Sequence, residues 1–146
     1  MSEGWDRAAL VELIERQHSE LWGRGDLSLI EECYADDFVG HFPGRVVRGH
    51  QGIRSEVVGH RTTFPDWQEE VLRVIVEGGT VVSHFRSGGT DRGGFSGSPP
   101  TGKRVDITEV AVFRVQGVKI VEQWVYPDII ALQRQLGPGE TGRPAP

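Results

Sequence analysis

Asp128 stands between a strand-like run and a helix-like run in the stretch "EQWVYPDIIALQ". An aspartate at the start of a helix can accept hydrogen bonds from the first free backbone amides and so cap the helix. If the strand instead continues with regular alternation, Asp128 points into a pocket with Trp124 and Tyr126. A carboxylate in an apolar pocket loses hydration, which raises its pKa and suits it to proton transfer near neutral pH. The residues alone leave both roles open.

His84 is the second candidate for acid/base chemistry, in the strand-like run "TVVSHFRS". Imidazole can transfer or position a proton near neutral pH, although a lone histidine on a strand is more often structural. His41, in "DDFVGHFPG", is a candidate substrate contact. The other three histidines are expected at the surface or on a helix face: His18, His50 and His60.

Aromatic and charged side chains supply further candidates for substrate contacts. Phe64 and Trp124 are expected to line a pocket in which a flat aromatic ligand could stack. If Gln116 and Gly117 form the last hairpin loop, Glu109 lies opposite Trp124 and shares its face with Glu122. These two acids then lie at a wet rim, or partly buried near Arg86. The full set of predicted substrate contacts is His41, Phe64, Trp67, Arg86, Glu109 and Trp124.

Other kinds of site are disfavoured by spacing and charge. The histidines show no H-x-H or H-E-x-x-H spacing, and Cys33 is distant from them in the sequence, so no metal site is predicted. The glycines in 88–97 precede a strand and lack the Lys-Ser/Thr pair of a phosphate loop, so they are interpreted as a flexible lip. A net charge of −5 with interspersed acids and bases argues against nucleic acid as a partner.

The elements that must position these residues change character near Pro65. An apolar stripe after Asp6 predicts a first helix, Asp26 can cap a second, and a third spans about residues 50–63. Four β-rich runs and a short last helix follow. The sequence therefore predicts an α+β fold, with helices on one face of a curved antiparallel sheet. A single domain is expected over 1–137 and a disordered tail over 138–146.

Composition suggests where the protein works and how it associates. Both faces of the last predicted hairpin are largely apolar, which favours helices on one face and a second subunit on the other. A single cysteine, no signal-like N-terminus and no apolar run of about 18 residues predict a cytoplasmic protein without a membrane partner.

Several strings in the chain resemble the SnoaL-like polyketide cyclase family, a branch of the nuclear-transport-factor-2-like superfamily. They are "FPDW", "GGTDRGGFSGSPPTGK", "VFRVQGVKIVEQW", Asp128 and "QRQLG", and the resemblance runs from the first helix to Gly137. It implies a cone-shaped α+β barrel around an apolar pocket, with dimerisation through the outer sheet face. It also implies aldol-type ring closure of an aromatic polyketide without metal or organic cofactor, with Asp128 as the acid/base. Where many relatives have "GTH", this chain has Asp91, expected to be a solvated loop acid.

The resemblance specifies a family without specifying the reaction. Relatives also include cofactor-free hydroxylases and cyclases that open epoxides, and epoxide opening would require an acid and a base together, such as Asp128 and His84. A different class of function is a non-catalytic small-molecule-binding module, because this fold also serves as a binding scaffold.

Overall fold

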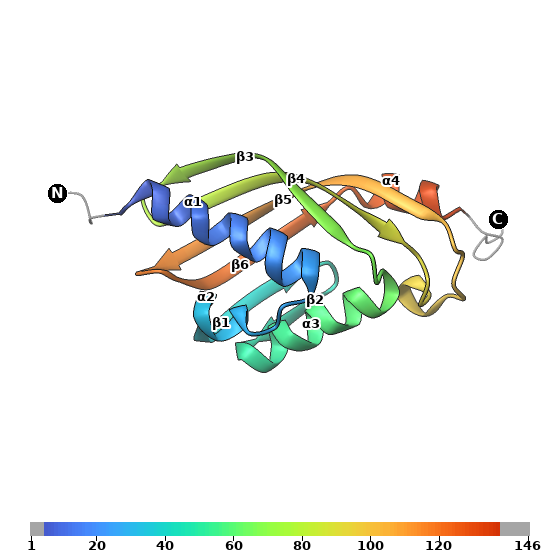
Figure 1. The fold of residues 1–146 in the computed structure, drawn as a ribbon, viewed down its shortest axis with the longest axis horizontal. Coiled ribbons are helices and arrows are strands. Elements are labelled where there is room, and N and C mark those ends of the chain that lie inside the picture. Colours follow the sequence, from blue (N-terminus) through green and yellow to red (C-terminus); the bar gives the residue numbers. More distant parts are fainter. Residues whose placement is uncertain (1–4, 138–146) are drawn as a thin grey trace.

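The computed structural model describes residues 5–137, which form a six-stranded sheet with helices packed against one side (Figure 1). The strand order is β2-β1-β6-β5-β4-β3. The strands are β1 Tyr34–Phe42, β2 Arg45–Arg48, β3 Gln68–Glu77, β4 Thr80–Thr90, β5 Arg104–Gln116 and β6 Lys119–Pro127. The helices are α1 Arg7–Arg16, α2 Leu29–Cys33, α3 Gly49–Thr63 and α4 Ile129–Leu136, with a π-helical turn at Gln17–Trp22 and a 3-10 turn at Phe95–Gly97. The predicted tail, 138–146, lies outside the described residues.

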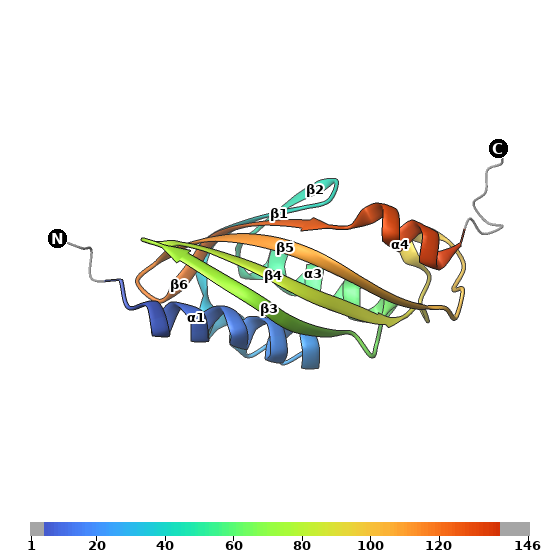
Figure 2. The same ribbon diagram turned by 90° about the horizontal axis from the view of Figure 1, so that it is seen from above.

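The sheet is curved and open, with β2 and β3 as its edges in the described part of the chain. Figure 2 shows α1 and α3 on the same side of it and α4 beyond the end of β6. We call the side that faces these helices the inner face and the opposite side the outer face. The predicted α+β fold with helices on one face of a curved sheet is confirmed. No helix among residues 5–137 is long and apolar enough to cross a membrane.

The first helix begins where the sequence predicts. Asp6 caps α1, since its Oδ1 accepts hydrogen bonds from the amides of Ala8 and Ala9 at 3.1 and 3.3 Å. The apolar stripe then packs into the core through Leu10, Leu13 and Ile14. The helix widens into the π-helical turn Gln17–Trp22, which the sequence did not predict and which is a frequent feature of functional sites.

Two details of the sheet differ from the prediction. The short strand β2 was not predicted; it pairs antiparallel with β1 through the turn at Pro43 and Gly44. Strand β1 also pairs with β6 in parallel, so the sheet is mixed rather than purely antiparallel. The parallel pairing is possible because α3 and the β3–β5 strands intervene between β1 and β6 in the chain.

The register of the last hairpin is the main error of the sequence prediction. Gln116 pairs with Lys119, and a bulge further along the hairpin adds one residue to β6. Glu109 therefore pairs with Pro127 and not with Trp124. Because neighbouring strand residues face opposite sides, this odd offset moves the β6 side chains beyond the bulge, from Glu122 onward, to the other face.

The segment between β4 and β5 is organised around Asp91, which was predicted to be solvated and is instead fully buried. Its carboxylate accepts hydrogen bonds from the Gly94 amide at 2.9 Å and from the amide and hydroxyl of Thr101 at 3.0 and 2.9 Å. Gly93 also passes so close to α3 that a Cβ atom there would lie 2.4 Å from the Thr62 carbonyl oxygen. Asp91 is thus the structural anchor of residues 91–103. This segment overlaps the glycine-rich stretch that was predicted to be a lip, and we call it the lip below.

Candidate active site

The inner face of the sheet, the π-helical turn, α3, α4 and the lip line an open cavity of about 440 Å³. Pockets for small organic molecules span about 300–1,000 Å³, so this volume suits such a ligand. Its wall carries the aromatic residues Trp22, Phe42, Phe64, Trp67, Phe85 and Phe95. Its polar and charged lining includes Gln17, His18, Arg45, Glu56, His60, Glu69, Glu109 and Gln123.

A buried hydrogen-bonded chain on this wall links His18 to Glu69. The Nδ1 atom of His18 lies 2.6 Å from Oε1 of Glu69, and its Nε2 atom lies 2.9 Å from the hydroxyl oxygen of Ser83. The indole N–H of Trp67 donates to the other oxygen of Glu69 at 2.8 Å. Both oxygens of Glu69 therefore act as acceptors, and both nitrogens of His18 have partners. This arrangement fixes an imidazole–carboxylate pair in place.

Glu109 lies on the same wall, one strand further across the sheet. It is 8% exposed, and the hydroxyl of Ser87 donates to its Oε2 at 2.6 Å. Burial, followed by the negative charge of Glu69, raises the pKa of Glu109 to about 8, while the bond from Ser87 opposes this shift. At neutral pH the Glu109 carboxyl group is therefore largely protonated.

The two glutamates occupy opposite environments within one cavity. Glu69 receives two hydrogen bonds from fixed donors, whereas Glu109 receives one and faces a desolvated wall. Ser87 stands between them, because it pairs with Glu69 across β3–β4 and donates to Glu109 on β5. Carboxyl groups with opposed environments in one site are typical of acid/base pairs. The arrangement can hold a proton on Glu109 and release it near neutral pH.

Asp128 is not placed as a catalytic group by this geometry. Its side chain is exposed, and Oδ1 accepts a hydrogen bond from the Ala131 amide at 3.0 Å, which caps α4. The neighbouring residues Pro127 and Ile129 line the cavity, but Asp128 does not. The expectation that Asp128 points into the pocket with Trp124 is therefore wrong, because β6 ends at Pro127 and the chain turns into the helix.

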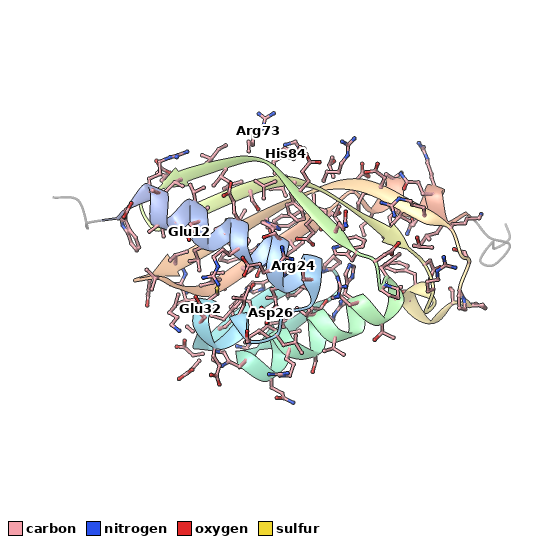
Figure 3. All side chains as sticks on the ribbon, viewed as in Figure 1. Glu12, Arg24, Asp26, Glu32, Arg73 and His84 are labelled. Atoms are coloured by element: carbon pink, nitrogen blue, oxygen red, sulfur yellow. The ribbon has the colours of Figure 1, made fainter. Side chains whose placement is uncertain are left out.

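His84 and Arg86 lie on the outer face, away from the cavity. Their β4 neighbours Ser83 and Phe85 face inward, so alternation turns His84 outward. His84 pairs with Arg73 of β3, and Figure 3 shows the two side by side at the outer edge of the sheet. Arg86 forms an exposed ion pair with Asp106 at 3.2 Å. The prediction that these residues reach the pocket is contradicted.

His41 and Trp124 also face outward. Their rings stack with centroids 5.1 Å apart and an interplanar angle of 8°, and His41 lies 2.7 Å from a carboxylate oxygen of Glu122. The predicted pocket positions of Trp124 and His41 fail because of the register offset and because Phe42, the residue after His41, is the one that lines the cavity. Of the predicted contacts, the structure brings Phe64, Trp67 and Glu109 together on the wall.

Sequence reasoning missed several polar residues of the site, although a signal for them existed. Gln17 and His18 lie three to four residues from Ile14 and Leu21, so they belong to the apolar stripe of the first helix. They are 0% and 2% exposed, which contradicts the surface position expected for His18. Two polar side chains within an apolar stripe predict a buried polar site. Ser83 and Ser87 give the same signal, because they alternate with the inward-facing Phe85 on β4.

Comparison with known proteins identifies relatives of this arrangement. Residues 12–136 match the family model described as SnoaL-like polyketide cyclase. A solved structure from Jannaschia sp. CCS1, described as a candidate SnoaL-like polyketide cyclase, is 28% identical with a TM-score of 0.82, covering 91% of this chain and 97% of that chain. TsrD from Streptomyces laurentii is 25% identical with a TM-score of 0.82, covering 91% of this chain and 98% of that chain.

A third solved structure is described by a different activity. AclR from Streptomyces galilaeus, described as a candidate hydroxylase, is 29% identical with a TM-score of 0.72, covering 90% of this chain and 94% of that chain. No curated protein matches the chain. The agreement over nearly the full length of both chains confirms the predicted family and its fold.

Proposed function

Because the chain belongs to the SnoaL-like polyketide cyclase family, we propose that it closes a ring in a polyketide-like aromatic molecule by cofactor-independent acid/base chemistry. The observation that supports this most is Glu109, a buried carboxyl group on the cavity wall whose pKa burial raises to about 8. A group with a pKa near the working pH can both take and return a proton efficiently.

In the proposed reaction Glu109 acts in turn as base and acid. Its carboxylate form removes a proton from a carbon between two carbonyl groups, and the C–H electron pair forms an enolate. The enolate carbon attacks an internal carbonyl carbon, which forms the new C–C bond and places the carbonyl π electrons on oxygen. That alkoxide takes the proton back from Glu109. Atoms balance without an oxidant or reductant, and the product is an isomer of the substrate.

The neighbouring residues have supporting roles in this proposal. The hydroxyl of Ser87 orients Glu109, and the His18–Glu69 pair supplies fixed dipoles and charge close to it. The six aromatic side chains on the wall would hold a flat substrate in a folded, reactive conformation and keep water out. Asp128 is assigned only the capping of α4.

The proposal is tested most simply by proton abstraction, which does not require the natural substrate. An aromatic probe with a 1,3-dicarbonyl side chain should exchange its acidic C–H for deuterium in D2O faster with the protein than without it. Glu109→Gln should abolish the acceleration, because an amide cannot take the proton. Ring closure of longer probes would be detected by liquid chromatography with mass spectrometry, as a new peak with the same mass as the probe.

Two matched variants make the test specific. Glu122→Gln makes the same change on the outer face, and Asp128→Asn makes the equivalent change at the α4 cap. Both should retain the acceleration. If Glu109→Gln exchanges as fast as the wild type, Glu109 is not the base, and if no variant or wild type accelerates exchange while aromatic ligands still bind, the protein is a binding module.

Epoxide opening is a second candidate that the site supports. It requires an acid beside the epoxide oxygen and a base beside a hydroxyl, and the cavity holds a largely protonated Glu109 together with the His18–Glu69 pair. An epoxy-alcohol probe should then give a cyclic ether, and both Glu109→Gln and His18→Gln should lose the reaction. Under the aldol proposal His18→Gln should slow turnover without abolishing it.

We further propose that the protein is a homodimer through the outer sheet face. Tyr126 is 59% exposed there, two residues from Trp124 of the stacked pair His41–Trp124 on β6, and Ile75 is 56% exposed on the edge strand β3 of the same face. An apolar sheet face of this kind is more stable when covered. Light scattering should give twice the chain mass, and Tyr126→Glu should give the single-chain mass. A monomeric wild type at micromolar concentration would contradict the proposal.

A further inference from the structure

Two polar atoms of cavity-lining residues have no hydrogen-bond partner within residues 5–137. They are Oε1 of Gln123 and Nε2 of His60, and both atoms are buried. A buried polar atom without a partner destabilises a fold, so native proteins keep few of them. Two of them around one cavity point to a ligand that supplies the missing hydrogen bonds.

Gln123 lies on the inner face of β6 and is 3% exposed. Its neighbours across the sheet are Gly40 on β1 and Phe113 on β5, neither of which has a polar side chain. An amide oxygen is an acceptor only, so its partner must be a donor. A ligand hydroxyl meets this requirement, whereas a carboxylate, a ketone or an ether does not.

His60 lies on α3 among three aromatic rings. The ring centroids of Trp22, Phe64 and Trp67 are 5.7, 5.3 and 4.1 Å from its own. Burial lowers the pKa of His60 to about 3, so the imidazole is neutral at physiological pH. A neutral imidazole has one donor and one acceptor nitrogen, and a hydroxyl can pair with either. A hydroxyl carried on an aromatic ring would also pack against the surrounding rings.

The charges on the wall oppose an anionic ligand. Among the lining residues, acidic side chains are supplied by Glu56, Glu69 and Glu109, and the arginine is Arg45. Arg45 already donates from Nε to one Glu56 oxygen at 2.9 Å and from Nη2 to the other, and its Nη1 donates to the Pro43 carbonyl. Glu109 is largely protonated and Glu56 is paired with Arg45, so the acid left among these groups is Glu69, and a ligand carboxylate would meet its negative charge without a free cation among these groups to balance it.

We infer that Gln123 and His60 form a hydroxyl-recognition subsite, which selects neutral phenolic aromatic ligands over their ether and carboxylate analogues. The inference rests on the proposed function, because it takes the cavity as the substrate site. It concerns binding alone, so it can fail or stand separately from the chemistry assigned to Glu109.

The test uses three matched probes, 2-naphthol, 2-methoxynaphthalene and 2-naphthoate, whose binding is measured by isothermal titration calorimetry at pH 7. The wild type should bind 2-naphthol about tenfold more tightly than 2-methoxynaphthalene, since only the hydroxyl can donate to Gln123. The naphthoate should bind most weakly of the three. Equal affinities for the naphthol and its methyl ether would overturn the inference without any variant.

Variants of single residues show which side chains produce the preference for the hydroxyl. Gln123→Leu removes the acceptor at similar size, so the ratio of naphthol to methyl ether affinity should fall close to one. His60→Phe should lower the same ratio, whereas Gln51→Leu, at an exposed α3 glutamine that is not among the cavity-lining residues, should leave it unchanged. A ratio within one protein cancels any general effect on folding. A ratio that is unchanged in both Gln123→Leu and His60→Phe overturns the subsite.

The two proposals separate cleanly in this design. If the hydroxyl selectivity is present but Glu109→Gln exchanges protons like the wild type, the subsite stands and the proposed catalytic role fails. If Glu109→Gln is inactive but the selectivity is absent, the subsite fails and the catalytic role stands.

Discussion

Replacing Glu109 with glutamine should make the protein increasingly more stable than the wild type as the pH rises. Burial raises the pKa of Glu109 from its ordinary value of 4.5 to about 8. The folded protein then holds a proton on Glu109 over a pH range in which the unfolded chain has released it. The contribution of Glu109 to the free energy of unfolding of the wild type therefore falls as the pH rises through this range. Glutamine has nearly the same shape and does not titrate.

The size of this stability difference follows from the interval between the ordinary and the raised pKa of Glu109. Each pH unit in which the folded and unfolded states differ by one proton changes the free energy of unfolding by about 1.4 kcal/mol. The interval from 4.5 to about 8 therefore corresponds to at most about 5 kcal/mol. The stabilising contribution of the protonated carboxyl is fully present below pH 4.5 and is lost as the pH passes through 8.

Urea unfolding, followed by tryptophan fluorescence at several values between pH 5 and 9, measures this directly. The difference in unfolding free energy between Glu109→Gln and the wild type should grow with pH and level off above about 8. Glu122→Gln is the matched control, because its hydrogen bond to His41 lowers the pKa of Glu122 and it is ionised throughout this range. Its difference from the wild type should stay flat. A flat difference for Glu109→Gln as well would refute the raised pKa and the mechanism built on it.

Further predictions concern other titrating and hydrogen-bonded groups. Because burial lowers the pKa of His60 to about 3, its contribution to the free energy of unfolding should shrink as the pH falls from 6.5 toward 3, so the difference between His60→Phe and the wild type should shift in favour of the variant; an equal difference in urea unfolding at pH 4 and pH 7 would contradict this. Asp128→Ala should cost about 1 kcal/mol by removing the α4 cap and Asp128→Asn almost nothing, with turnover kept in both; a dead Asp128→Asn enzyme would return Asp128 to the mechanism. Asp91→Ala should destabilise the protein by about 1–3 kcal/mol and speed limited proteolysis within residues 91–103, and unchanged cleavage would count against its anchoring role. The kcat/KM for C–H exchange should rise with pH with a midpoint near pH 8 and level off above it, as Glu109 ionises, and a flat profile would argue against Glu109 as the base.

The elements were predictable because local signals determine them. Helix α1 begins after Asp6 as predicted, and the change from helical to alternating patterns near Pro65 matches the start of β3 at Gln68. The order of these elements predicted helices on one face of a curved sheet, and the family resemblance implied the same architecture. The short strand β2 could not be found, because four residues carry too little periodicity and its pairing depends on the turn at Pro43 and Gly44.

The site was less predictable because it depends on register. One bulge in the β5–β6 hairpin decides whether Trp124 or Gln123 faces the cavity, and bulges leave little trace in a single sequence. Asp128 is in the position that the resemblance implies for the catalyst, but the turn after Pro127 directs it to the α4 amides. Glu109 was predicted as a substrate contact, but its raised pKa was not predicted. That pKa depends on burial and on the charge of Glu69, which is distant in the sequence and close in the folded sheet.

The polar residues of the first helix show what sequence reading can recover. Gln17 and His18 were assigned no role, yet their spacing from Ile14 and Leu21 places them on the buried stripe. The hydroxyl of Tyr34 donates to Gln17 at 3.0 Å, so this part of the core is itself a hydrogen-bonded network. A polar residue at an apolar stripe position therefore deserves the same scrutiny as an acid at the end of a strand.

The central claim is that Glu109 carries a proton at neutral pH and exchanges it in the cavity. The infrared difference spectrum between the wild type and Glu109→Gln measures that proton directly, because a protonated carboxylic acid and a carboxylate absorb at separate positions. We predict a carboxylic acid band at pH 6 that is absent from Glu109→Gln and disappears with a midpoint near pH 8. A difference spectrum that contains only carboxylate bands at pH 6 would contradict the account.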